Sequence, residues 1–401
     1  MAYIKKFGKC ILICKGEDNV VIDKENLKYL YIILLRTIYK PLALLPVKEN
    51  RVIFESFSGD GYNCNPKYIS EKLRNKYGDK VEIIWAFNNP EKFQKELPSN
   101  IKVCKYRSIK HLIYRLTSKI YVCNFLQAIE FPKNHKQIAI QTWHGGGCYK
   151  TVGNQESGRL STYIKRQNIQ LLETDFFISS SDYFKQKVIK EQFNFDGKIL
   201  NVGMPRNDIL IENSSDEKIL NLKRKIGVSD DTIIVLYAPT WKQTSDKYET
   251  LDVGLLKRSI EKRFNKKCEV LFRTHLYGNQ KMSNVKNVSE YSDMQELLLI
   301  SDVLITDYSS SMWDFSFTNK LCLLFTPDLE EYTSNRGFDE DIFTWGFPVC
   351  QTNETLSQEI LEYSEDSFKL KMREHHEFLG ATESGEASQK VTDIIISYLN
   401  I

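Results

Sequence analysis

The feature that most constrains this fold is an alternation of short apolar runs with stretches of helical spacing. Helical stretches such as 65–78 and 108–119 lie between several of the runs. The first series of apolar runs comprises 51–57, 81–87, 101–106, 119–125, 137–143, 175–181 and 198–203. Strands that alternate with helices favour a parallel sheet covered by helices on both faces.

A second series of apolar runs follows a polar, charged stretch at 212–231. Its members are 232–241, 267–276, 302–310 and 321–328. The first of them is almost entirely apolar, as expected for a strand buried on both faces. We therefore predict an α/β chain with two doubly wound, Rossmann-like domains at 47–220 and 221–401, after an N-terminal segment 1–46. Because such sheets bind ligands beyond the carboxyl ends of their strands, the site is expected in a cleft between the facing domains.

Charge and cysteine content narrow the class of protein. A formal net charge of only +3 over 401 residues argues against a polybasic nucleic-acid-binding protein. The nine cysteines include no C-x-x-C pair, and their odd number within apolar runs indicates reduced thiols in a cytosolic protein. No secretory signal is visible at the N-terminus.

The segment from Leu27 to Pro46 is apolar but too interrupted to span a membrane. Its apolar residues follow helical spacing, and its cations are Lys28, Arg36 and Lys40. Two interpretations stay open: a helix packed on its own domain, or an interfacial helix on an anionic bilayer.

Two histidines stand where an apolar run ends, His144 in the first domain and His275 in the second. A histidine at a strand end that faces a cleft can act as acid or base near neutral pH, although many such histidines are structural. Three glycines follow His144, and glycines allow close approach of a ligand to backbone N–H groups. A tight turn is the competing explanation.

Charged and hydroxyl-bearing residues follow other runs. Arg273 and His275 lie two residues apart and suit a diphosphate, although an edge-strand ion pair is the alternative. Ser309, Ser310 or Ser311 could cap a helix and form an anion site, or serve as a cap alone. The stretch "VGMPRND" at 202–208 and the stretch "YAPTWK" at 237–242 are predicted either to line the cleft or to be ordinary turns.

Taken in order, these stretches resemble the CDP-glycerol:poly(glycerophosphate) glycerophosphotransferase family of teichoic-acid and capsule synthesis. The resemblance covers roughly residues 50 to 395. Its motifs are "SFSGDGYNCNPKYISEKL", "QTWHGGGCYKTVG", "VGMPRND", "LYAPTWK", "RTH", "SDVLITDYSSSMWDF", "PDLEEYTSNRGF" and "GEASQKV".

The resemblance implies a GT-B-like pair of domains, with a lipid-linked acceptor on the first and a CDP-alditol donor on the second. It implies that His144 is the base and that His275 helps to hold the donor. The predicted donor residues are Arg273, Ser309, Ser310, Arg336, Asp307 and Thr240. The predicted acceptor and loop residues are Gly145, Gly146, Lys150, Arg206, Asn207 and Asp208.

We therefore expect a peripheral enzyme on the cytosolic face of the cell membrane that transfers an alditol phosphate to an acceptor hydroxyl and releases CMP. The alternatives are a nucleotide-sugar glycosyltransferase and a non-catalytic protein that binds a lipid-linked polymer. The sequence does not decide whether the donor carries glycerol or ribitol, which acceptor and polymer are used, or whether the enzyme is a primase or a polymerase. It also leaves the oligomeric state open. It requires no cofactor, contains no carboxylate cluster with Mg²⁺ spacing, and leaves dependence on Mg²⁺ open.

Overall fold

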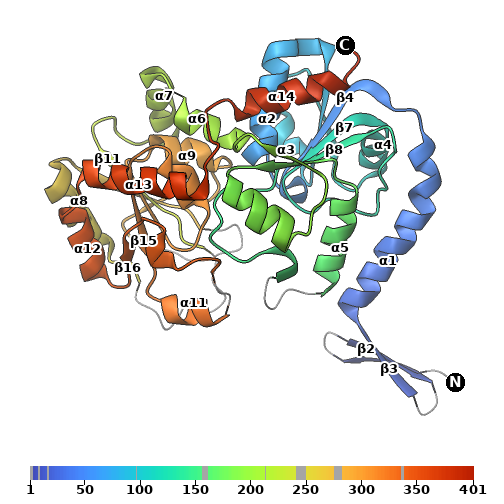
Figure 1. Ribbon diagram of the computed structural model, residues 1–401, viewed down its shortest axis with the longest axis horizontal. Coiled ribbons are helices and arrows are strands. Elements are labelled where there is room, and N and C mark those ends of the chain that lie inside the picture. The colour runs from blue at the N-terminus through green and yellow to red at the C-terminus, as the bar shows by residue number, and fades with distance from the viewer. Residues whose placement is uncertain are drawn as a thin grey trace.

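The computed structural model describes residues 3–7, 10–15, 18–95, 97–155, 161–212, 214–240, 250–274, 282–335 and 338–401. Within these ranges the chain forms two parallel sheets, each with helices packed around it (Figure 1). The predicted α/β class with two doubly wound domains is confirmed.

All seven runs of the first series are strands of one parallel sheet, in the order β10-β9-β8-β7-β4-β5-β6. Their bounds are β4 (Lys48–Glu55), β5 (Glu82–Phe87), β6 (Ile101–Lys105), β7 (Ser118–Cys123), β8 (Ile138–Gln141), β9 (Phe176–Ser179) and β10 (Lys198–Asn201). The central strands β7 and β8 are buried over most of their length and β4 over its second half, which explains the apolar residues in these parts of the strands.

The second series forms a parallel sheet in the order β13-β12-β11-β14-β15-β16. The predicted strands are β11 (Ile233–Tyr237), β12 (Cys268–Phe272), β14 (Val303–Thr306) and β15 (Leu321–Phe325). Two-residue strands complete the edges, β13 (Lys286–Asn287) and β16 (Val349–Cys350). These edge strands were not predicted, because two residues carry no alternation of apolar and polar side chains.

Helices connect the strands and cover both sheets. They are α2 (Cys64–Tyr77), α3 (Pro90–Gln94), α4 (Ile109–Thr117), α5 (Ser161–Leu172), the π-helix η5 (Phe184–Gln192), α6 (Asp208–Ile211), α7 (Asp216–Ile226), α8 (Val253–Phe264), α9 (Met294–Ile300), α10 (Ser311–Ser316), α11 (Leu329–Asn335), α12 (Asn353–Leu361) and α13 (Glu365–Leu379). Short 3₁₀ turns are η1 (Lys40–Leu44), η2 (Phe57–Gly59), η3 (Gly78–Lys80), η4 (Gly153–Gln155), η6 (Pro205–Asn207) and η7 (Ile342–Thr344). Local sequence sets several of their ends: Ser215 caps α7, and Gly227 ends it with φ +74°.

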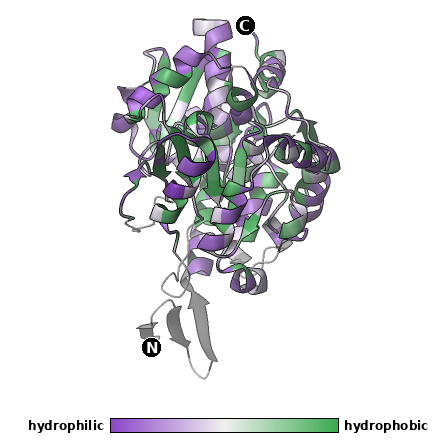
Figure 2. Ribbon diagram, turned by 90° about the vertical axis from the view of Figure 1, so that its left-hand side faces the viewer, coloured by the Kyte–Doolittle hydropathy of each residue, from purple (hydrophilic) through white to green (hydrophobic). Residues whose placement is uncertain are grey.

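Hydrophobic residues concentrate on the strands, and the helices around them carry more hydrophilic residues (Figure 2). One large core surrounds the second sheet, and two cores cover the two faces of the first. Each sheet therefore has its own core, as expected for two domains.

The last helix, α14 (Ala387–Tyr398), leaves the second domain and returns to the first (Figure 1). It packs along α2, and its residues Val391 and Ile395 are fully buried in a core of the first sheet. The division predicted at residue 221 therefore omits this return, and the segment before α14 crosses between the domains.

The N-terminal segment forms a small antiparallel sheet, β1 (Tyr3–Phe7), β2 (Cys10–Lys15) and β3 (Asp18–Asp23), followed by α1 (Lys24–Tyr39). The sequence predicted the helix but not the sheet. Figure 1 shows α1 along the outside of the first domain, with β2 and β3 beyond its far end.

Candidate active site

His144 lies just beyond β8, at the carboxyl edge of the first sheet. Its ring is surrounded by the rings of Phe57, Phe125 and Trp143, with centroids 5.3, 5.4 and 4.3 Å away. Its Nδ1 is 2.9 Å from the carbonyl oxygen of Asn124. Because a carbonyl oxygen only accepts hydrogen bonds, Nδ1 carries the proton and Nε2 is the basic nitrogen of the neutral ring. This geometry suits a general base.

The backbone around His144 is strained. Trp143 has φ +54°, which is unusual for a bulky residue, and Phe57 and Ser58 after β4 also have positive φ. Two side chains hold Trp143 in place: the Gln141 Oε1 accepts from its N–H at 2.9 Å, and the Asn65 Nδ2 donates to its carbonyl at 3.0 Å. Strain of this kind clusters at functional sites, where the surrounding structure fixes it.

The glycine loop after His144 crosses to the second domain. A Cβ on Gly145 would lie 3.8 Å from the Ser310 Cβ, so the loop passes beside the predicted donor residues. A Cβ on Gly146 would lie 2.2 Å from the Trp313 Cδ1, which no side chain tolerates. Packing against Trp313 therefore explains Gly146 without a ligand.

The loop ends inside the second domain. The Tyr149 hydroxyl is 2.9 Å from the His375 Nε2, and Tyr149 is buried in the core of the second sheet. Lys150 forms an antiparallel bridge with Phe338, and its ammonium group lies 5.6 Å from the Tyr332 ring centroid. The position of His144 is thus linked to that of the second domain.

The residues that are predicted to bind the CDP-linked donor, after β11 and β14, meet at the carboxyl edge of the second sheet. The Asp307 carboxylate accepts from the Thr240 N–H at 2.9 and 3.0 Å and from its hydroxyl at 2.9 Å. Ser309 accepts from the Ser311 hydroxyl at 3.1 Å, just before α10. Ser309 and Ser310 are half-buried and lie on the side of the second domain that faces the His144 loop.

Arg273 follows β12 at the same edge. Its guanidinium donates to the Tyr291 carbonyl oxygen, and desolvation lowers the pKa of Arg273. The other two predicted donor residues, His275 and Arg336, lie outside the residues that the structure describes.

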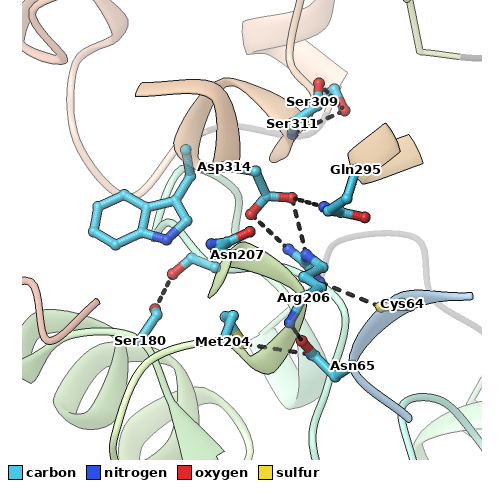
Figure 3. A network of polar contacts seen from close by, with 12 residues as sticks. Cys64, Asn65, Ser180, Met204, Arg206, Asn207, Gln295, Ser309, Ser311 and Asp314 are labelled. Atoms are coloured by element: carbon cyan, nitrogen blue, oxygen red, sulfur yellow. Dashed lines mark hydrogen bonds and ion pairs between the residues drawn. The ribbon is translucent and has the colours of Figure 1, made fainter. Parts of the chain in front are cut away.

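The three predicted residues of the "VGMPRND" loop, Arg206, Asn207 and Asp208, are buried. Figure 3 shows Arg206 and Asn207 among other protein side chains. Arg206 donates twice to the Asp314 carboxylate, each time at 2.9 Å, and so joins the two domains. Asn207 donates to Glu383 at 3.1 Å. Asp208 accepts from two N–H groups at the start of α14, those of Ala387 and Ser388. A contact of these residues with the acceptor stays a prediction.

Sequence reasoning missed other polar residues at this junction. Lys67 on α2 pairs with Asp293 and with Glu296, the latter at 3.0 Å, across the domain boundary. Glu383 accepts from the N–H of Met204 and from the indole of Trp313. No local pattern marks these residues, since their partners are more than 60 positions away.

Among the described residues, His, Cys, Asp and Glu side chains form no group of three or more that could hold a metal ion. In the same part of the chain, no helix is long and apolar enough to cross a bilayer.

Comparison with known proteins identifies this arrangement. The profile of the CDP-glycerol:poly(glycerophosphate) glycerophosphotransferase family matches residues 37–397. The chain belongs to this family. It is therefore a transferase of teichoic-acid synthesis, as the motifs predicted.

Individual members of the family support the assignment. The teichoic acid poly(glycerol phosphate) polymerase of Bacillus spizizenii is 30% identical over 90% of this chain and 95% of its own length. The teichoic acid glycerol-phosphate transferase of Staphylococcus aureus is 27% identical over 93% and 99%. The chain spans about half the length of two further polymerases that it matches.

A solved structure supports the fold as well. The wall teichoic acid polymerase TagF superposes with a TM-score of 0.78 at 26% identity, over 93% of this chain and 97% of that one. The predicted GT-B-like pair of domains is confirmed by this match.

Proposed function

We propose that this glycerophosphotransferase moves an alditol phosphate, glycerol phosphate or ribitol phosphate, from a CDP-linked donor to a hydroxyl of a lipid-linked acceptor. The acceptor oxygen forms a bond to the β-phosphorus of the donor, the bond to the bridging oxygen breaks, and CMP leaves. The proton of the hydroxyl passes to the Nε2 of His144. Charge on the departing phosphate is stabilised by Arg273, His275, Ser309, Ser310 and Arg336.

The observation that carries this proposal is the position of His144. Its Nδ1–H donates to a backbone carbonyl, which makes Nε2 the unprotonated nitrogen of the neutral ring, and its loop passes beside Ser310 of the donor domain. A base on one domain and phosphate-binding residues on the other suit a transfer across the junction.

The test is CMP release. Wild-type protein is incubated with a lipid-linked acceptor and either CDP-glycerol or CDP-ribitol, with and without a chelator that removes Mg²⁺. A new phosphodiester together with CMP supports the proposal, and a glycosidic product with UDP or GDP would indicate a sugar transferase instead.

The role of His144 is tested by His144→Ala. General base assistance is typically worth 10²–10⁴-fold, so we expect kcat to fall at least about 100-fold. Binding of the CDP-alditol, measured by calorimetry, should be nearly unchanged. His135→Ala is the matched control, because His135 is an exposed histidine of the same domain. Near-normal turnover in folded His144→Ala would refute the role of His144 as the general base.

The proposal includes a membrane surface, because a lipid-linked acceptor stays in the bilayer. Four apolar side chains of α1 lie at helical spacing and are more than half exposed: Leu30, Tyr31, Leu34 and Ile38. The nearby Lys28 and Lys40 are also exposed. We place this apolar stripe on the anionic inner face of the cell membrane, where each cation adds about 1 kcal/mol of attraction.

The opposite face of α1 holds the helix on the first domain. Ile32 is buried, and the Arg36 guanidinium pairs with Glu173 and donates to the Ile129 carbonyl at 2.6 Å. Arg36 therefore has a counter-ion within the domain, and the exposed cations beside the apolar stripe are Lys28 and Lys40.

Because α1 is anchored in this way, substitution tests the membrane contact better than truncation. The triple variant Leu30→Ser, Leu34→Ser, Ile38→Ser should keep the melting temperature and lose sedimentation with anionic vesicles. Activity on an acceptor analogue without a lipid should survive. Undiminished vesicle binding would exclude the stripe and shift attention to α4, where Ile109 and Ile113 are exposed.

A further inference from the structure

We propose that Glu383 is a positioning residue that aligns the His144 loop of the first domain with the donor-side serines of the second. The inference rests on the proposed function. Glu383 lies between α13 and α14, in the segment that carries the chain back to the first domain. Beside it, Ala381 forms an antiparallel bridge with Ser181, and the Thr382 N–H donates to the Ser180 carbonyl at 2.9 Å.

Three donors from two domains converge on the Glu383 carboxyl group. Its Oε2 accepts from the Met204 N–H at 2.9 Å, and its Oε1 accepts from the Asn207 Nδ2 at 3.1 Å. Both donors belong to the loop after β10 of the first sheet. The third donor is the Trp313 indole on α10 of the second domain, 3.2 Å from Oε1. One carboxyl group therefore joins the two domains.

Two glycines make room for this arrangement. A Cβ on Gly203, which has φ +92°, would lie 2.8 Å from the Glu383 Oε2. A Cβ on Gly146 would lie 2.2 Å from the Trp313 Cδ1, and the Gly146 carbonyl accepts from the Ser180 hydroxyl. The close packing at both glycines shows that Glu383 and Trp313 fit tightly against the two first-domain loops.

These contacts link Glu383 to the reacting groups through Trp313. Trp313 packs on Gly146, two residues after His144, and it lies three residues after Ser310 on α10. Loss of the Glu383 hydrogen bond would allow the indole to move and change the distance between His144 and the serines. A shift of about 1 Å in such an alignment can cost roughly 100-fold in rate.

The protonation of Glu383 provides a second way to test its role. Desolvation, assisted by the nearby Asp314, raises the pKa of Glu383 to about 8, although its hydrogen bonds oppose the rise. The other charged groups nearby are Arg206, which pairs with Asp314, Asp208 of α6, which accepts from N–H groups at the start of α14, and Asp182 beside Gly380. A raised pKa means that the folded protein favours the protonated carboxyl group. Glu383 therefore stabilises the contact between the two domains at low pH, and this stability is lost as the pH rises through about 8.

The experiment compares Glu383→Ala, Glu383→Gln and Trp313→Phe with the control Glu386→Ala. Glu386 is an exposed carboxylate of the same segment. We expect Glu383→Ala to lower kcat at least about tenfold, while the Kd of CDP-glycerol changes less than twofold. Wild-type kcat should decline above pH 8, and Glu383→Gln should lack this alkaline decline because it cannot ionise. Glu386→Ala should match the wild type.

A readout without turnover separates this inference from the proposed function. The chain has five tryptophans, and Trp313→Phe assigns the indole ¹⁵N–H signal of Trp313 in an NMR spectrum. That signal should shift between pH 7 and pH 9 in the wild type and stay in place in Glu383→Gln. An unshifted wild-type signal, or kcat within twofold of wild type in folded Glu383→Ala, would overturn the inference. A wild type that releases no CMP refutes the proposed function, while the indole signal still tests Glu383.

Discussion

Replacement of Arg206 by alanine removes one partner of a buried ion pair between the domains. The Arg206 and Asp314 side chains are only 3% and 5% exposed, and two parallel hydrogen bonds of 2.9 Å join them. In Arg206→Ala, the Asp314 carboxylate keeps its hydrogen bond from the Gln295 amide, at 2.9 Å, among the described residues. A charged group would then be buried without its counter-ion.

The size of the loss follows from these contacts. A hydrogen bond to a charged group is worth about 1.5–3 kcal/mol, so two give about 3–6 kcal/mol. Removal of one partner of a buried pair typically costs about 3–5 kcal/mol. We therefore expect the free energy of unfolding of Arg206→Ala to fall by about 3–5 kcal/mol. The deficit should persist at 0.5 M salt, because buried pairs are weakly screened.

Urea unfolding followed by circular dichroism measures this difference. Arg224→Ala is the control, since Arg224 is exposed and a surface substitution should stay within about 0.5 kcal/mol. The double variant Arg206→Met, Asp314→Leu removes both charges and should recover much of the loss. Because the pair joins two domains, Arg206→Ala should also separate the transition into two steps. A loss below about 1 kcal/mol with a single transition would refute the reasoning.

Two further predictions concern packing and pH. Gly146→Ala places a Cβ 2.2 Å from the Trp313 ring and should lower the melting temperature. The control Gly145→Ala, whose Cβ would have its nearest contact at 3.5 Å, should leave the melting temperature unchanged. Equal melting temperatures of the two variants would contradict this packing. Desolvation lowers the pKa of His376 to about 4, so the folded chain binds fewer protons than the unfolded chain, and stability is lost as the pH falls from about 6.5 to 4. Thermal melts between pH 7 and pH 4.5 should show a smaller decline in His376→Gln than in the wild type, and an equal decline would assign the effect to other groups.

The sheets and the place of the site were predictable from local sequence. Strands such as β8 and β14 are buried on both faces, so each appears as an unbroken apolar run with a polar or glycine-rich end. His144 lies three residues after the last residue of β8, and parallel strands bring their carboxyl ends to one edge of the sheet. The sequence therefore determined that a histidine and a pair of serines would lie at sheet edges.

Other features were decided only by the tertiary structure. The apolar face of α14 indicates that the helix is buried but not in which core, and it packs on the first sheet. Arg206 and Asp314 are 108 positions apart, and Trp313 and Glu383 are 70 apart. The sequence predicted that Gly146 allows a ligand to approach, with a tight turn as the alternative, and only the structure shows that Trp313 occupies the space beside it. These pairings depend on how the two sheets face each other. The spacing of apolar residues within a single strand or helix carries no information about that arrangement.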